Sequence, residues 1–271
     1  MKVACSIQQE EEVKVRDGGR NGEVEGEVAA TRLLWALGFA ADRMYPVRVV
    51  CRGCPDDYGL ATANPGERLV DPATIERKMP WKEVVTGDRP GWSWAELDLI
   101  DDQAGGAPKA HRDALKLLAV MLQHTDTKAE QQRLLCLDEK QPSAPFSCAH
   151  PFVMLNDLGL TFGRAHLSNQ NLIGSVNLAD WSKTPVWKNP TGCVGNLPKS
   201  FTGTLQDPLI SEEGRQFLVR LLSQLSDTQV HDLFSVAPVD PRPPPPHHPG
   251  SGPAPRAQQR RSFHGTTAGS A

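Results

Sequence analysis

An almost wholly apolar segment at residues 111–123, HRDALKLLAVMLQ, constrains the fold more than any other part of the sequence. From Ala114 to Leu122 its apolar residues fall nearly all around a helix, and a helix that is apolar on every side must be buried. Other elements must therefore surround it. A chain of 271 residues is long enough to do so, as one large domain or as two lobes with a cleft between them.

Before this helix the sequence predicts a strand, a helix and a second strand. Residues 13–16 alternate valine with basic residues, which is typical of a strand with one basic face. A helical pattern begins at Glu27, and Gly38 is placed to end it. The segment YPVRVVC at residues 45–51 is a second predicted strand.

After the buried helix the pattern changes to short strands and then to helices. The segments QRLLCL at residues 132–137 and PFVMLN at residues 151–156 are predicted strands. Two later helices are expected to open at Ser211 and Ser226, because each serine precedes acidic residues that suit a first helical turn. Residues 52–95 are rich in Gly and Pro and give no clear element.

The composition changes near residue 237. From there on the chain is rich in proline and poor in large apolar residues, so it cannot bury enough surface to offset the entropy of ordering. The predicted division is an α/β segment at 1–103, a mainly helical segment at 104–236 and a disordered tail at 237–271.

Charge and hydropathy exclude several classes of partner. A net charge of −3 gives no sign of a nucleic-acid partner. No run of 18 apolar residues occurs, so no transmembrane segment is expected, and residues 1–12 do not read as a signal peptide. As written the protein is expected in the cytoplasm, whereas a signal peptide upstream of Met1 would make it an exported protein.

Six cysteines allow a metal or redox role. Cys51 and Cys54 form a CxxC, but no second pair follows at zinc-finger spacing, so two partly buried thiols are favoured over a metal site. A Cys-based metal or redox protein built around that pair stays open as a weaker alternative. A disulfide such as Cys136–Cys148 is expected only if a longer form of the protein is exported.

The polar stretch that follows the buried helix carries the pattern of a phosphotransfer site. Protein kinases place a catalytic aspartate in H-R-D-x-x-x-x-N and a metal-binding aspartate in D-F-G. Here His124-Thr125-Asp126 is an H-x-D, Gln131 stands five residues after Asp126, and Asp157-Leu158-Gly159 is a D-x-G. One carboxylate would orient the attacking hydroxyl, while other oxygens would hold a cation beside the phosphates.

A literal HRD at residues 111–113 is a chance match. Five residues beyond Asp113 lies Leu118, an apolar residue inside the predicted buried helix, so no metal ligand can follow. The tripeptide is better interpreted as the charged start of that helix.

Phosphate-binding groups are expected upstream and in the loop. Kinases hold the α- and β-phosphates with a strand lysine that forms an ion pair with a helix glutamate. Lys14 or Arg16 on the basic strand, paired with Glu27, fits that arrangement. Lys128, two residues after Asp126, is a further candidate to neutralise a phosphate.

Three segments resemble atypical kinases. GEVAATRLLWALGF at residues 26–39 resembles a helix of the secreted Fam20-like kinases, and NDLGLTFG at residues 156–163 resembles the metal-binding segment of type II phosphatidylinositol 4-kinases. HTDTKAEQQRL at residues 124–134 is similar to the catalytic loop of phosphatidylinositol and HipA-type kinases. The whole, over residues 11–165, looks most like a bacterial group of kinase-like proteins with that atypical fold.

The resemblance implies a fold, a cofactor and residue roles. The expected fold class is α+β, a two-lobed protein-kinase-like fold with a reduced N-lobe and a mainly helical C-lobe. The expected cofactors are ATP and Mg²⁺ or Mn²⁺, and the substrate would be a protein or a small hydroxyl compound. Asp126 would be the catalytic residue, Gln131 and Asp157 the metal ligands, and the residues near the nucleotide would be Lys14, Arg16, Glu27 and Lys128.

Two departures favour an alternative without turnover. Residues 1–12 leave no room for the Gly-rich hairpin that covers the phosphates in kinases. Gln131 is one methylene longer than asparagine and loses more rotamer entropy when it binds a cation. A catalytically inactive pseudokinase that serves as a binding or scaffold protein therefore remains the principal alternative.

Overall fold

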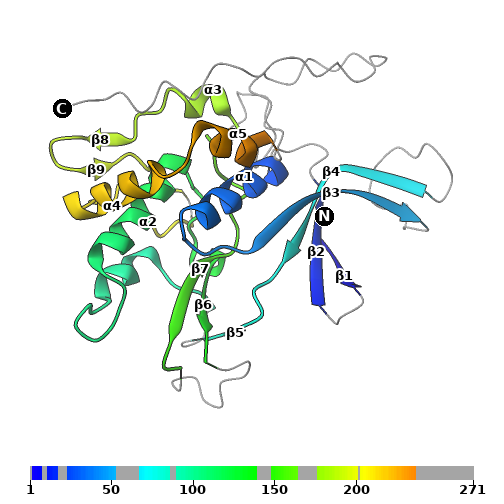
Figure 1. The fold of residues 1–271 in the computed structure, drawn as a ribbon, viewed down its shortest axis with the longest axis horizontal. Coiled ribbons are helices and arrows are strands. Elements are labelled where there is room, and N and C mark those ends of the chain that lie inside the picture. Colours follow the sequence, from blue (N-terminus) through cyan, green and yellow to red (C-terminus); the bar gives the residue numbers. More distant parts are fainter. Residues whose placement is uncertain are drawn as a thin grey trace.

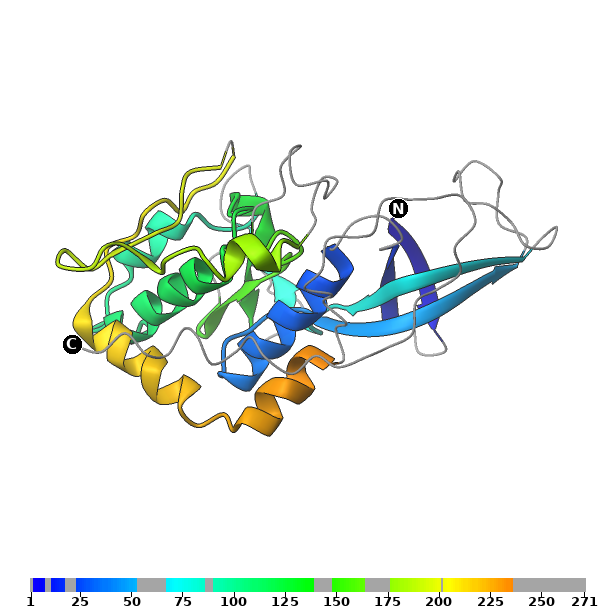
Figure 2. The same cartoon turned by 90° about the horizontal axis from the view of Figure 1, so that it is seen from above.

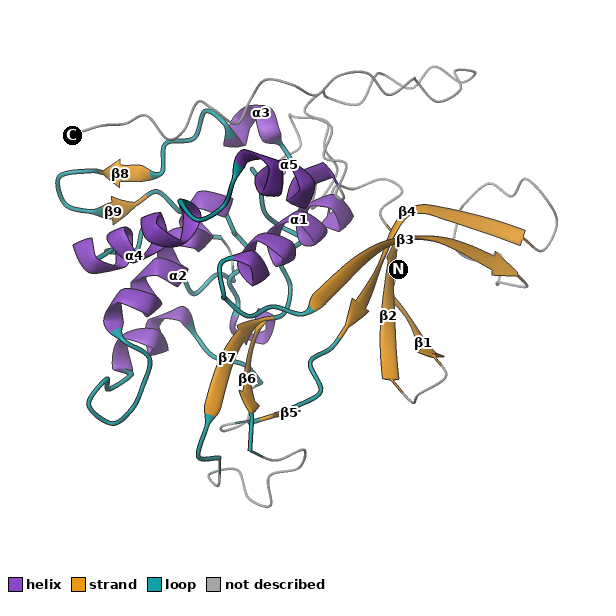
Figure 3. Ribbon diagram, in the orientation of Figure 1, coloured by secondary structure: helices purple, strands orange, loops and turns teal. Residues whose placement is uncertain are grey.

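A computed structural model places helices together with three small sheets, so the fold is a mixture of α and β elements (Figures 1 and 3). It describes residues 2–7, 11–17, 23–52, 67–85, 90–138, 148–163, 176–200 and 202–235. The predicted disordered tail at 237–271 lies outside these residues. For residues 2–7, 11–17, 51, 67–70 and 72 only the backbone is described.

The first sheet has four antiparallel strands in the order β1-β2-β4-β3. The strands are β1 (Lys2–Ile7), β2 (Glu11–Asp17), β3 (Arg43–Arg52) and β4 (Glu67–Arg77). The sequence predicted β2 and β3. It did not predict β4, in which Pro72 and several charged residues break the expected alternation. It did not predict β1 either, and the expectation that residues 1–12 leave no room for a hairpin is corrected, because β1 pairs antiparallel with β2.

Helix α1 (Glu23–Ala36) connects β2 to β3. It begins four residues before the predicted start at Glu27, with Glu23 and Glu25 in its first turn, where the helix dipole favours negative charge. Val28 and Leu34 lie in the main apolar core. Gly38 has a φ of 80° and ends the helix as predicted, since glycine adopts this conformation without steric cost.

The predicted buried helix is α2 (Lys109–Leu122), and almost all of its side chains are buried. It ends at Gln123, whose backbone is left-handed and whose Nε2 donates to the Asn196 carbonyl at 2.8 Å. The literal HRD lies within this helix, as the sequence indicated. Before α2 come β5 (Lys82–Glu83) and the short 3₁₀ helix η2 (Trp94–Leu99).

The predicted hairpin follows α2 as β6 (Gln132–Cys136) and β7 (Pro151–Leu155), which pair antiparallel. The 3₁₀ helix η3 (Ala129–Gln131) leads into β6, and β5 adds a third strand to this sheet. At its inner end Gln132 pairs with Leu155, and at its outer end Cys136 pairs with Pro151. The hairpin therefore carries the two predicted site segments at one end.

The remaining described elements cover α2 and α1. They are α3 (Leu178–Trp181), β8 (Trp187–Asn189), β9 (Val194–Gly195), α4 (Glu212–Leu222) and α5 (Asp227–Ser235). Ser211 caps α4 by accepting a hydrogen bond from the Gly214 amide at 3.2 Å, and Ser226 likewise accepts from Gln229 at the start of α5. Both helix starts agree with the prediction.

Figure 2 shows the four-stranded sheet extending to one side of the helical part, with α1 beside the junction. The apolar core of the helical part is formed by α1 and α2 with residues from η2 and α4. Among the described residues, no helix is both long enough and apolar enough to cross a membrane.

Candidate functional site

Two backbone hydrogen bonds tie the polar loop after α2 to the segment after β7. The Thr125 amide donates to the Leu160 carbonyl at 3.2 Å, and the Asn156 amide donates to the Gln131 carbonyl at 2.8 Å. On the loop, Asp126 lies between Thr125 and Gln131. On the segment after β7, Asp157 lies between Asn156 and Leu160. The fold thus fixes two carboxylate-bearing segments against each other on both sides of the carboxylates.

Asp126 is held by two side chains of its own loop. Its Oδ2 accepts from Lys128 Nζ at 2.9 Å and from Gln131 Nε2 at 3.0 Å. The Asp126 side chain retains 16% of its exposure and that of Lys128 retains 35%. Within the described chain both bonds reach Oδ2, so Oδ1 is the oxygen left for a group from outside.

His124, the histidine of the H-x-D pattern, was not among the site residues predicted from the sequence. It is fully buried, its ring packs 6.3 Å from that of Trp94, and neither ring nitrogen has a hydrogen-bond partner in the described chain. Burial lowers the pKa of His124 to about 4, although the nearby charges of Asp126 and Asp157 act in the opposite direction. The imidazole is therefore neutral at pH 7.

The D-x-G segment packs directly on α1. Glu27 is fully buried, and its Oε1 accepts a hydrogen bond from the Leu158 amide at 3.1 Å. A Cβ at Gly159 would lie 3.3 Å from Glu27 Oε2, and a Cβ at Gly26 would lie 3.0 Å from the Gly159 carbonyl oxygen. Glycine at both positions lets the helix approach closely enough for a carboxylate to fix the backbone next to Asp157.

The predicted partners of Glu27 lie on β2, the strand before α1. In the register of the sheet Lys14 stands opposite Glu76 and Arg16 stands opposite Thr74. The side chains of Lys14 and Arg16 fall outside the described part of the structure. Their ion pair with Glu27 and their contact with a phosphate stay predictions.

A second support for the loop comes from far along the chain. The Thr127 carbonyl accepts from the Thr204 amide at 3.0 Å and from the Thr204 hydroxyl at 2.6 Å, while Thr127 Oγ1 accepts from the Leu205 amide at 3.2 Å. No local pattern marks this contact, because its partners are 77 residues apart. The loop is consequently restrained on both sides of Asp126.

Oxygen donors suited to a divalent cation are present beside Asp157. Gln131 donates through its amide nitrogen to Asp126, which leaves its amide oxygen for a cation. Asn156, only 8% exposed, has a buried Oδ1 without a hydrogen-bond partner among the described residues. Carboxylate and amide oxygens are the ligands that Mg²⁺ and Mn²⁺ prefer, so this donor set fits either ion.

The cysteines differ in what the structure describes. Cys51 lies on β3, and Cys54 lies outside the described residues, so the CxxC site stays a prediction. Cys136 and Cys148 form a disulfide across the outer end of the β6–β7 hairpin. The sequence had made that pairing conditional on export.

Comparison with known proteins finds a weak structural likeness and no match in sequence. No protein-family model and no curated protein matches this sequence. Among solved structures, the crystal structure of the Helicobacter pylori proinflammatory kinase CtkA is similar, with 12% sequence identity and a TM-score of 0.46. The match covers 88% of this chain and 80% of that chain. A likeness this weak does not establish a family or an activity for this chain.

Proposed function

We propose that this chain is an atypical kinase-like phosphotransferase with a two-lobed arrangement, which uses ATP and Mg²⁺ or Mn²⁺. The observation that carries the proposal is the pair of backbone hydrogen bonds that brackets Asp126 and Asp157, Thr125 to Leu160 and Asn156 to Gln131. Support also comes from the order of the parts along the chain. A basic strand, a helix glutamate, an H-x-D loop and a D-x-G follow one another as they do in protein kinases.

In this proposal each residue has one task. Asp126 Oδ1 accepts the proton of the substrate hydroxyl as the hydroxyl oxygen attacks the γ-phosphorus and ADP leaves. Asp157 and Gln131, with Asn156 beside them, hold the divalent cation, which neutralises charge on the phosphates. Lys128 contacts the transferred phosphate, and Lys14 or Arg16, oriented by Glu27, contacts the phosphates that stay on the nucleotide. The substrate is a protein or a small hydroxyl compound.

The principal alternative is a pseudokinase that binds nucleotide or a partner without turnover. One observation favours it: Asp126 Oδ2 is already engaged by Lys128 and Gln131 of the same loop. The two functions differ in a single outcome, because only the phosphotransferase consumes ATP in an Asp126-dependent way.

Thermal unfolding in the presence of nucleotide tests the nucleotide site that the phosphotransferase requires. A ligand at 100 times its dissociation constant stabilises the folded state by about 2.7 kcal/mol, which corresponds to roughly 5–10 °C for a domain of this size. We expect such a shift with ATP and Mg²⁺ or Mn²⁺, and its loss in Asp157→Asn.

The matched control is Asp232→Asn, which changes a carboxylate that is 70% exposed on α5. It should shift as the wild type does. If neither Mg²⁺ nor Mn²⁺ with ATP raises the melting temperature of the wild type, the nucleotide site is wrong and the phosphotransferase is abandoned, which leaves a pseudokinase that binds a partner.

A further inference from the structure

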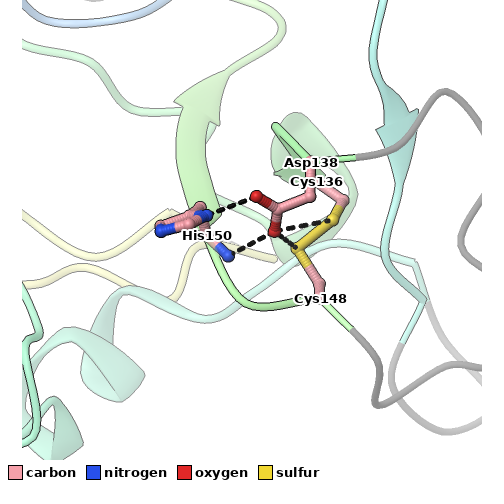
Figure 4. Close-up of a disulfide and its surroundings, with 4 residues drawn as sticks. All are labelled: Cys136, Asp138, Cys148 and His150. Carbon is pink, nitrogen blue, oxygen red and sulfur yellow. Dashed lines mark hydrogen bonds and ion pairs between the residues drawn. A yellow bond between two sulfur atoms is a disulfide. The ribbon is translucent and has the colours of Figure 1, made fainter.

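Four side chains with metal-binding chemistry gather at the outer end of the β6–β7 hairpin (Figure 4). Cys136 is the last residue of β6, and Cys148 and His150 come just before β7. The Asp138 Oδ2 lies 3.9 Å from Cys136 Sγ and 4.0 Å from Cys148 Sγ. One carboxylate oxygen is therefore nearly equidistant from the two sulfur atoms.

His150 fixes this carboxylate in place. Its backbone amide donates to Asp138 Oδ2 at 2.7 Å, and its ring Nδ1 pairs with Asp138 Oδ1. A disulfide has no proton to donate to a carboxylate, and the bond between the sulfurs does not by itself explain why an oxygen held in this way faces both of them.

We propose that this cluster is a zinc site when Cys136 and Cys148 are reduced, with the two thiolates and Asp138 as ligands and water in the fourth position. Cysteine, histidine and carboxylate are the ligands zinc takes in proteins. In a tetrahedral site with ordinary Zn–S and Zn–O distances, ligand atoms lie about 3.5–3.8 Å apart. The carboxylate oxygen is already within a few tenths of an ångström of that separation from each sulfur, so only the sulfurs must move apart.

His150 completes the site by orienting a ligand. Ligating carboxylates are ordinarily hydrogen-bonded by a second residue, and loss of such a partner weakens metal binding by about 10- to 100-fold. The ring and the backbone amide of His150 do this for Asp138.

The two states interconvert by balanced reactions. Zinc binding by the two thiols releases two protons and forms two zinc–sulfur bonds. Oxidation by a small-molecule disulfide joins the two sulfurs and releases the zinc ion, and the small molecule takes up two electrons from the thiolates and two protons from water to become two thiols. Either state ties the end of β6 to the start of β7, and the chain is suited to both environments that the sequence left open, a reducing cytosol and an oxidising compartment outside it.

This site is separate from the proposed phosphotransfer site. Cys136 pairs with Pro151 at one end of the hairpin, whereas Gln132 pairs with Leu155 at the end that carries Gln131 and Asp157. Zinc binding here requires none of the residues proposed to act on nucleotide.

Zinc titration of the reduced, full-length protein tests the inference. The protein is reduced with a phosphine, freed of reductant without oxygen, and titrated with zinc chloride, and bound zinc is measured by native mass spectrometry. We expect one equivalent more than in the Cys136→Ser/Cys148→Ser variant, an affinity at least 10-fold lower in Asp138→Asn, and a loss of about 10- to 100-fold in His150→Ala. Addition of glutathione disulfide should release that equivalent.

Two controls exclude the other thiols. Cys5→Ser/Cys193→Ser removes Cys5 together with Cys193, which is free in the structure, and Cys51→Ser/Cys54→Ser removes the CxxC. Both should keep the equivalent of zinc. Equal zinc binding by the wild type and the Cys136→Ser/Cys148→Ser variant would overturn the inference, as would unchanged affinity in Asp138→Asn, a variant that keeps both thiols and is checked for folding by circular dichroism.

Discussion

The chain contains the pattern H-x-D twice, and the structure puts the two copies to opposite uses. Asp113, on α2, is fully buried, and its Oδ2 accepts from Lys109 Nζ at 2.5 Å and from the Ser211 amide at 3.1 Å. Asp126, in the loop, keeps 16% of its exposure, and within the described residues its carboxylate is held by side chains of the same loop.

The histidines of the two motifs show the opposite pattern of burial. His111 is exposed on α2 and stacks on Phe217 of α4 with ring centroids 4.1 Å apart. His124 is fully buried and has no hydrogen-bond partner in the described chain. In the helix, then, the aspartate faces the interior and joins two helices, whereas in the loop the histidine faces the interior and leaves the aspartate accessible. A motif acquires its chemistry from the element that carries it.

Asp126→Asn should have the largest effect on ATP consumption, and this effect distinguishes the loop motif from the helix motif. The variant loses the group proposed to accept the substrate proton, so ATP consumption with Mg²⁺ or Mn²⁺ should fall at least about 100-fold. The melting temperature should change by less than about 2 °C, since the asparagine keeps the side-chain volume. Unchanged ATP consumption would show that any turnover has another source.

Asp113→Ala should have the opposite effect, because it should lower the stability and leave ATP consumption unchanged. Lys116, 5% exposed, lies 3.7 Å from Asp113, and removal of a buried charge from its partners costs about 3 kcal/mol. We expect this loss of unfolding free energy in urea, with ATP consumption per folded molecule as in the wild type. A stable Asp113→Ala variant would contradict the structural role of the helix copy.

Gln131 sharpens the comparison, because the helix copy has no amide at the equivalent position. Gln131→Asn should keep or raise the Mn²⁺ affinity of the nucleotide complex, since asparagine loses less rotamer entropy, and Gln131→Ala should lower it by about 10-fold, within the range for loss of one group that supports a metal site. Calorimetric titration of Mn²⁺ at saturating ATP measures both. Equal affinity in all three proteins would remove Gln131 from the metal site.

A third aspartate, Asp42, is buried like Asp113 but lacks a hydrogen bond to one of its carboxylate oxygens. Asp42 is fully buried, and although Arg133 Nη1 lies 3.6 Å from its Oδ2, that oxygen has no hydrogen-bond partner in the described chain. Burial raises the pKa of Asp42 from 3.8 to about 6, against the favourable charge of Arg133.

The folded protein therefore binds more protons than the unfolded chain between about pH 4 and pH 6, and this contribution to stability is lost as the pH rises through that window. Asp42→Asn should be about 1 kcal/mol more stable than the wild type at pH 7, after allowance for the lost ion pair. The difference should shrink toward pH 4 in urea unfolding. An equal difference at both pH values would contradict the raised pKa.

Sequence reasoning predicted the elements whose patterns are local. Apolar periodicity gave α2 and α1, short apolar runs gave β6 and β7, and the serines gave the starts of α4 and α5. Strand β4 was missed because Pro72 and several charged residues interrupt the alternation of apolar and polar residues that marks a strand. The segment is a strand because it pairs with both β2 and β3.

The sequence predicted which residues form the site but not the hydrogen bonds that hold them in place. Asp126 and Asp157 stand out by motif, but the contacts that fix them join distant parts of the chain. Glu27 and Leu158 are 131 residues apart, and Thr127 and Thr204 are 77 apart. Such contacts depend on the packing of whole elements, which a pattern along one chain does not contain.

The most direct test of the central claim is calorimetric titration of the Mn²⁺ complex of a non-hydrolysable ATP analogue into three proteins at a temperature where each is folded. The wild type and Asp113→Ala should bind one equivalent with the same affinity, and Asp157→Asn should bind at least 10-fold more weakly. Binding that is absent from the wild type, or that Asp157→Asn leaves unchanged, would contradict the assignment of the loop and the D-x-G segment as one nucleotide site.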